Sequence, residues 1–360
     1  MNGRAHDMGA TDRPFPSEGR LRCRARDPER GAVAVVVALL MVVLLAAAAL
    51  AVDGGMLYAK RAALQSGADA AALAVAQKCA ASLTDPQCTS SSSLAPSLAR
   101  SNDAVDSAGI ASLELDTRAR TVTATTQPLQ PGQQAGSVSL FLAQTLGIAS
   151  VRASAQAQAA WGSPSAGPAV FPLAFSVCQV QGYVDGGMQL LQSHGKNINP
   201  GCTYGPSGQV VPGGFGWLTQ DPGRCAATID ISTGSASSDP GNSPPSNCTD
   251  LLNKWAAQIQ AGTSPTVLLP VFTSVAGEGA NATYTLAGFA AFKVAGWKFS
   301  GVDALPDSYA NQPPSVPSSL SCTGSCRGII GQFITYVSLD TAYTLGPSTA
   351  FGATVVRLSR

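Results

Sequence analysis

The longest apolar run in the chain extends from residue 31 to residue 52 and reads GAVAVVVALLMVVLLAAAALAV. It contains no charge, no proline and no side chain that forms hydrogen bonds. Because a helix rises about 1.5 Å per residue, this run is long enough for a hydrocarbon core of about 30 Å. A helix that is apolar on every side has no face for water. The pattern therefore predicts a membrane span at residues 31–52.

Basic residues gather before this span and are sparse after it. Five arginines lie between residues 20 and 30, whereas the first charge after the span is Asp53. Since basic flanks stay in the cytoplasm, we expect a single-pass protein of the cell membrane with an extracytoplasmic C-terminal region. Residues 1–30 contain few large apolar side chains and are predicted to form a disordered cytoplasmic tail. The alternative is a cleavable signal peptide cut near residues 46–49, although such apolar regions usually span only about 7–15 residues.

Helical spacing of apolar residues continues beyond the span. Leu57, Leu64, Ala68, Val75 and Cys79 recur at intervals that place them on one helical face. This face is narrow and rich in alanine, so another backbone could approach it closely. We therefore expect one long helix that ends near Cys79, and whose extracytoplasmic half packs against a helix of a partner protein.

Weaker patterns follow this helix. Residues 82–110 are rich in serine and proline and are interpreted as a loop or a short helix. Alternation in residues 113–127 predicts a hairpin, and the spacing in residues 137–149 predicts an amphipathic helix. Residues 150–161 alternate small apolar and polar side chains, as a strand does. These elements predict a small α+β unit over residues 53–161.

The second half of the chain has a different sequence pattern. The sequence GSPSAGP at residues 162–168 is typical of a linker or of a turn-rich entry to a second domain. Beyond it the pattern predicts one helix at residues 251–262, with Thr249 or Asp250 as its cap, and strands at residues 170–178, 266–275, 283–300 and 328–339. The fold class is therefore α+β, with a β-rich outer domain at residues 162–360.

The cysteines fit the proposed topology. Cys23 precedes the span, and eight cysteines follow it: Cys79, Cys88, Cys178, Cys202, Cys225, Cys248, Cys322 and Cys326. An even number beyond the span indicates disulfides in an oxidising compartment. Cys79–Cys88 and Cys322–Cys326 are the two local pairs that we expect, whereas the pairing of the other four stays open. No C-x-x-C pair is present and His194 is the sole histidine beyond the span, so no metal is expected.

Composition and motifs give no sign of catalysis. The net charge of +1 favours no nucleic-acid partner. His194 has no evident nucleophile beside it, no G-x-S-x-G motif is present, and Asp185 and Glu278 are interpreted as turn residues. We therefore expect no enzyme activity, no cofactor and no small-molecule substrate. Core packing is expected for Trp217 and Trp297, and for Phe215, although these aromatic residues could also bind sugar or peptide.

The segment from residue 30 to residue 74 resembles the amino-terminal segment of the TadE/TadG-like Flp pilus-assembly family. The matching residues are Arg30, Gly31, Asp53, Gly55, Tyr58, Arg61, Leu64, Gln65, Ala68, Asp69 and Ala72. The resemblance implies a membrane-anchored accessory protein of a tight-adherence pilus or a related secretion machine. It also implies that the partners are the membrane and other pilus-assembly or pseudopilin-like proteins.

Two features depart from this family pattern. Prepilins that are processed by the prepilin peptidase carry a glutamate inside the apolar run, and here Glu29 precedes the run. Some longer members carry a von Willebrand A-like domain with a D-x-S-x-S metal motif, and the nearest sequence here is Asp230 to Gly234, with glycine in the place of the second serine. An anchored adhesin or ligand-binding module and a secreted hydrolase remain the alternative functions.

Overall fold

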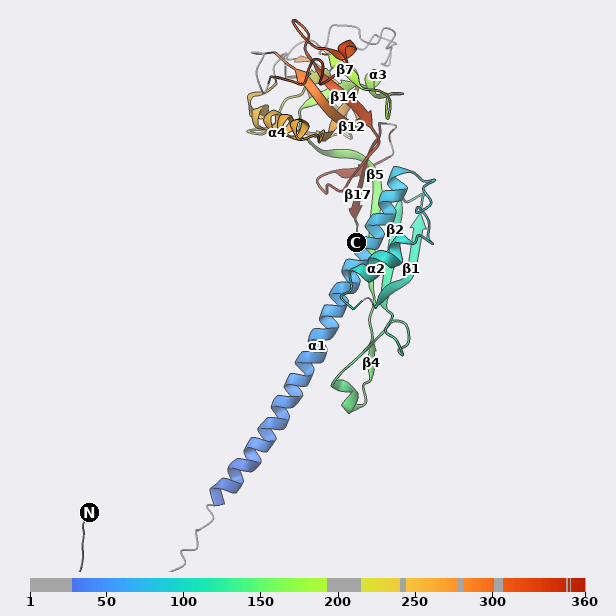
Figure 1. Ribbon diagram of the computed structural model, residues 1–360, viewed down its shortest axis with the longest axis vertical. Helices are drawn as coiled ribbons and strands as arrows, with labels where there is room; N and C mark the ends of the chain where they lie inside the picture. Colours follow the sequence, from blue (N-terminus) through green and yellow to red (C-terminus); the bar gives the residue numbers. More distant parts are fainter. Residues whose placement is uncertain are drawn as a thin grey trace, which may run out of the picture. The chain divides into compact units, whose positions relative to one another are not determined.

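The computed structural model describes residues 28–105, 107–192, 215–239, 244–277, 281–300, 307–347, 349 and 351–359. The chain divides into two compact units, Met1–Gly55 and Met56–Arg360, which we call the first and second units. Helix α1 (Pro28–Ala81) begins in the first unit and continues into the second (Figure 1). The tail predicted for residues 1–30 lies almost entirely outside the described residues.

The first unit consists, in its described part, of the apolar half of α1. Its large apolar side chains are exposed all along the helix, as in Leu44 (68%) and Leu50 (75%). Among the residues that the structure describes, α1 alone is long and apolar enough to cross a membrane. The long amino-terminal helix is thus confirmed, and its end at Ala81 is close to the predicted end at Cys79.

The second unit contains two main sheets. In the first sheet the strand order is β1 (Ala108–Asp116), β2 (Thr121–Pro128), β5 (Ala155–Ala169), β17 (Ala353–Leu358) and β15 (Tyr336–Ser338), and β9 (Ala227–Asp230) and β16 (Thr344–Gly346) pair with the far half of β5. The β1–β2 hairpin confirms the alternation in residues 113–127. The short helix α2 (Leu94–Ser101) lies in the segment that was interpreted as a loop or short helix.

Between β2 and β5 the chain forms a two-stranded ribbon. It consists of β3 (Ser137–Ser139), the 3-10 helix η1 (Ala143–Leu146) and β4 (Ser150–Arg152). The amphipathic helix predicted for residues 137–149 is therefore wrong. Val138 and Leu140 are both buried, so the alternation of a strand applies there. Gly147, at φ 86°, adopts a left-handed conformation that ends η1 after a single turn.

The predicted linker at residues 162–168 is also wrong, because β5 runs straight through it. The glycines of this segment allow close contact between strands. A Cβ atom on Gly162 would lie 2.7 Å from the carbonyl oxygen of Gly346. A Cβ atom on Gly167 would lie 2.4 Å from the ring of Tyr343. Glycine here makes room for neighbours and does not loosen the chain.

The second sheet contains the strands that the outer sequence predicts. Its order is β7 (Gln189–Gln192), β14 (Gly328–Ile334), β12 (Thr283–Lys298), β11 (Thr266–Ala276), β6 (Leu173–Ser176) and β8 (Phe215–Trp217), with β10 (Ser235–Ser237) and β13 (Ser308–Tyr309) on β12. The strand predicted at residues 170–178 stops at Ser176, where helix α3 (Val177–Val180) begins. Strands in the other three predicted segments are confirmed.

Helix α4 (Thr249–Gln260) confirms the helix predicted at residues 251–262, but its predicted cap is wrong. Cys248 occupies the cap position without a side-chain capping bond. The Thr249 hydroxyl donates to the carbonyl oxygen of Ser246 instead. A 3-10 turn at Ser246–Cys248, which the sequence pattern did not indicate, precedes the helix, and the helix begins two residues before the predicted start at residue 251.

Aromatic residues and disulfides hold the outer region together. Trp217 (2% exposed) and Trp297 (0%) belong to one core, which confirms the packing interpretation. The side chain of Phe215 lies outside the described residues. Disulfides join Cys79–Cys88 and Cys322–Cys326, as expected from their spacing, and also Cys225–Cys248. Cys178 is disulfide-bonded as well, and Cys202 lies outside the described residues.

Candidate functional site

The residues that carry the family resemblance lie along α1 and fall into two groups. Buried on one side of the helix are Asp53, Leu64, Ala68 and Ala72. The others include the partly buried Asp69 and the exposed residues Gly55, Tyr58, Arg61 and Gln65. Arg30 and Gly31 lie in the first turn of α1, where side chains are outside the described part. The motif is thus distributed between a packed face and an open face.

The packed face is covered by the protein's own sheet. Leu64, Ala68 and Ala72 are each 0% exposed. The alanines share a core with Ala124 of β2 and Ala157 of β5, and side chains this small let the helix lie close to the sheet. The expectation that this face binds a helix of a partner protein is therefore wrong. Helical spacing identified the face correctly, but its neighbour is a sheet that comes later in the same chain.

Helix α2 also approaches α1 closely, at Gly67. A Cβ atom on Gly67 would lie 3.1 Å from the Cα atom of Ala99 and 3.3 Å from its carbonyl oxygen. Both atoms belong to the backbone and cannot rotate away. Gly67 therefore sets the distance between the two helices, although it was not among the candidate residues.

Two hydrogen bonds fix the register of α1 against the sheet, and a third joins two residues of the helix. The Thr126 hydroxyl of β2 donates to the carbonyl oxygen of Leu64 at 2.8 Å. The Gln65 amide donates to Asp69 Oδ1 at 2.8 Å and to the carbonyl oxygen of Gln156 in β5 at 3.2 Å. Gln65 and Asp69 of the motif are thus paired along the helix, and Gln65 also ties the helix to β5.

A buried ion pair lies on the same side of α1. Lys60 Nζ lies 2.5 Å from Asp103 Oδ2 and 2.6 Å from the Ser107 hydroxyl oxygen. The same carboxylate oxygen accepts from the backbone N–H and the hydroxyl of Ser107, at 2.8 and 3.0 Å. Burial raises the pKa of the Asp103 carboxyl, but the bonds from Lys60 and Ser107 outweigh it, and the net shift is downward. Lys60 lies four residues before Leu64 and therefore on the same face of α1 as Leu64. Its partner Asp103 lies 43 residues later in the sequence, where no local pattern connects the two residues.

We expect the ion pair of Asp103 and Lys60 to make the free energy of unfolding depend on pH in the acid range. The folded-state pKa of Asp103 lies below its ordinary value of 3.8. Its contribution is therefore complete above the unfolded pKa and is lost as the pH falls through the lower folded value. In urea titrations from about pH 6 to about pH 3, Asp103→Asn should flatten the fall in unfolding free energy. An equally steep fall in the Asp103→Asn variant would contradict this role.

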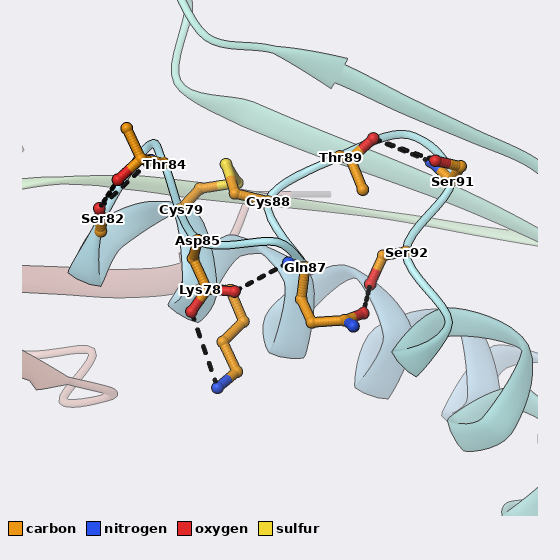
Figure 2. The surroundings of a disulfide bond; sticks show 10 residues. All are labelled: Lys78, Cys79, Ser82, Thr84, Asp85, Gln87, Cys88, Thr89, Ser91 and Ser92. Atoms are coloured by element: carbon orange, nitrogen blue, oxygen red, sulfur yellow. Dashed lines mark hydrogen bonds and ion pairs between the residues drawn. A yellow bond between two sulfur atoms is a disulfide. The ribbon is translucent and has the colours of Figure 1, made fainter.

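The carboxyl end of α1 is closed by the Cys79–Cys88 disulfide (Figure 2). Lys78 is in α1 just before the loop and Asp85 lies within the loop, with Lys78 Nζ 3.9 Å from Asp85 Oδ2. The other carboxylate oxygen of Asp85 accepts from the backbone N–H of Gln87 at 2.8 Å. The side-chain oxygen of Gln87 in turn accepts from the Ser92 hydroxyl at 2.8 Å. The loop that leads to α2 is thus held by one covalent link and several local polar contacts.

Removal of this disulfide should destabilise the second unit. The bridge closes a loop of 9 residues. A loop of this length corresponds to about 2.5 kcal/mol of unfolded-chain entropy. The double variant Cys79→Ala/Cys88→Ala is therefore expected to lose about 2.5 kcal/mol of unfolding free energy in urea titrations. Cys23→Ala is the control and should leave the unfolding midpoint unchanged.

The other candidate residues have structural partners or lie outside the described part. Asp230 accepts from the hydroxyl and backbone N–H of Ser232, and these two bonds lower the pKa of its carboxyl and close a turn after β9. Asp185 accepts from the backbone N–H and the hydroxyl of Thr335. His194 and Glu278 lie outside the described residues. No group of three or more histidine, cysteine or acidic residues is placed to hold a metal ion in the part of the chain that the structure covers.

Comparison with known proteins bears on the amino-terminal part of the chain. The model of the Tad family, TadE/G-like Flp pilus-assembly, matches residues 31–78. This range contains the apolar run and the part of α1 that packs on β2 and β5. The resemblance of the amino-terminal segment is thus confirmed. Neither a curated protein nor a solved structure gives a significant match to the chain.

Proposed function

We propose that this chain is a single-pass membrane protein of a Flp/Tad-type pilus assembly machine or a related envelope machine. It acts by binding other proteins and not by catalysis. The match to residues 31–78 carries the proposal, because this range joins the apolar run directly to the packed face of α1. Helix α1 has no break at residue 52, where the apolar run ends.

The proposed orientation places the amino end in the cytoplasm and the second unit outside it. Five arginines precede the apolar run, as in the cytoplasmic flank of a span. Three complete disulfides lie within the described part of the second unit. Disulfides of this kind are rare in a reducing cytosol. Both observations support the same orientation.

The open face of α1 is the proposed contact surface for a pilus-assembly or pseudopilin-like partner. Tyr58 is 78% exposed and Arg61 is also exposed, so packing within this chain does not explain their presence in the motif. Tyrosine and arginine are the side chains that most often dominate protein interfaces. The covered alanine face, by contrast, has no surface left for a partner.

The function is tested by deleting the gene in the native bacterium and measuring filaments sheared from the cell surface. We expect the deletion to abolish filaments and the full chain to restore them. Tyr58→Ala/Arg61→Ala should restore few filaments. The control Arg118→Ala/Tyr183→Ala removes the same residue types from exposed positions outside the matched range, and should restore them fully. Normal filament yield in the deletion strain would refute the proposed function.

The anchor and the compartment are tested by intact mass of the membrane-extracted protein. The chain contains nine cysteines, one of which precedes the span. We expect a full-length mass, carbonate-resistant membrane association, and alkylation of a single cysteine before reduction. All nine should react after reduction. A mass that begins beyond Ala49 would instead show cleavage of a signal peptide and release of the protein.

A further inference from the structure

The β3–β4 ribbon carries apolar side chains at its tip. Phe141 is 67% exposed and Ile148 is 53% exposed. Between residues 121 and 184 the single charged side chain is Arg152, at the end of β4. An uncharged, exposed apolar patch of this kind marks an interaction surface.

The ribbon lies at the end of the second unit that is connected to the apolar run. The bond from Thr126 to Leu64 and the bond from Gln65 to Gln156 mark one end of β2 and β5, and the ribbon leaves the sheet from this end (Figure 1). Phe141 lines one groove together with Met56 and Val105. Phe141, at the ribbon tip, therefore lies near Met56, the first residue of the second unit.

Met56 is only four residues beyond Val52, the last residue of the apolar run. Four residues of helix rise about 6 Å. The polar layer on each side of a bilayer is about 5–7 Å thick. If the apolar run fills the hydrocarbon core, Met56 lies at the depth of the lipid headgroups, and Phe141 lines the same groove as Met56.

We infer that the ribbon tip, residues 140–148, is a second membrane contact, which inserts Phe141 and Ile148 into the interface of the leaflet that the second unit faces. The inference rests on the proposed anchor. Lipid is the occupant that we propose, because Phe141 shares a groove with Met56, which follows the apolar run by only four residues of continuous helix. Aromatic side chains are enriched at that depth. The charge pattern agrees, since Arg152 at the base of the tip can meet lipid phosphate, and no carboxylate in the ribbon would repel it.

A second contact would change how the second unit is held. A unit attached by one helix can rotate about the helix axis. Insertion of the ribbon tip stops this rotation. Each side of α1 then keeps a constant direction in the plane of the membrane. The ribbon thereby sets the direction in which Tyr58 and Arg61 are presented to a partner.

The inference is tested by bromine quenching of tryptophan fluorescence in nanodiscs that contain the full chain. The probes are Phe141→Trp and Ile148→Trp, and the control is Tyr183→Trp, an aromatic position that is 41% exposed and outside the ribbon. The spectrum of the parent protein, with its four buried or distant tryptophans, is subtracted. In phosphatidylcholine brominated near the headgroup, each ribbon probe should lose most of its added emission, and the control should lose none.

Each outcome separates the inference from the anchor. If the chain elutes with the nanodisc but the ribbon probes are as insensitive to bromine as the control, the inference is overturned while the anchor stands. The patch would then be left for a protein partner. If the chain elutes apart from the nanodisc, the anchor and the inference both fail. Quenching that is stronger with bromine deep in the acyl chain than near the headgroup would also overturn an interfacial position.

Discussion

Replacement of Lys60 by methionine is expected to lower the free energy of unfolding of the second unit by about 3–5 kcal/mol. Methionine fills a similar volume but leaves the Asp103 carboxylate buried without its cation. A buried charge that has lost its partner is far more costly than the pair itself. The measurement is a urea titration of the full chain in detergent, followed by tryptophan fluorescence, for which Trp161 lies in the same core as α1.

Two variants show whether this loss comes from burial. Lys78→Met makes the same substitution in the same helix, but Lys78 is half-exposed and lies 3.9 Å from its acidic partner, so the loss should be under about 1 kcal/mol. The double variant Lys60→Met/Asp103→Leu removes both charges and should recover most of the stability. Equal losses for Lys60→Met and Lys78→Met would contradict the assignment of a buried pair.

Leucine at Ala68 and Ala72 should separate α1 from its own sheet. Both positions are 0% exposed and face β2 and β5, so the added methyl groups have no space to enter. Overpacking of this kind costs about 1–3 kcal/mol for each substitution. We expect a lower urea midpoint for Ala68→Leu/Ala72→Leu, together with faster proteolysis of the β1–β2 region. Loss of partner binding alone, with unchanged stability, would instead restore the partner-helix interpretation.

The matched control lies on the open face of the same helix. Ala59 and Ala62 are exposed, so Ala59→Leu/Ala62→Leu adds the same groups without displacing the sheet. This control should leave the free energy of unfolding within about 0.5 kcal/mol of the parent value. It also keeps the helix propensity of the two leucines equal between test and control.

Local sequence patterns predicted the secondary structure correctly where an element depends only on its own residues. The apolar run, the helical face of α1 and the β1–β2 hairpin each follow from the spacing of a few neighbouring residues. Such spacing identifies a buried face but does not show which other element packs against it. An alanine-rich stripe fits a helix or a sheet equally well, and the covering strands begin about fifty residues later.

The wrong predictions came from residues whose role depends on distant neighbours. Gly162 and Gly167 suggested a linker, but each makes room for an atom of a segment near residue 345. Residues 137–149 contain apolar side chains at helical spacing, but pairing with β4 selected the alternation of Val138 and Leu140. In both places a long-range contact decided between two local forms.

The candidate site could be predicted only in part for the same reason. The resemblance identified Leu64, Ala68 and Ala72 but could not show that their surface was already occupied. Lys60 and Gly67 were missed, although both lie at helical spacing from Leu64 on the packed side. A charge or a glycine on an otherwise apolar face is a usable sign of a buried partner or a close approach.

The path of β5 through the second unit has a mechanical consequence. Its first half pairs with β2 and β17 beside α1, and its second half pairs with β9 and β16. A pulling force applied to the β9 end therefore travels along the backbone of one extended strand to the end that is bonded to the helix. No slack segment lies between these two ends to absorb extension. Tension applied at the β9 end would therefore reach the bonds between β5 and α1 with little stretch of the chain.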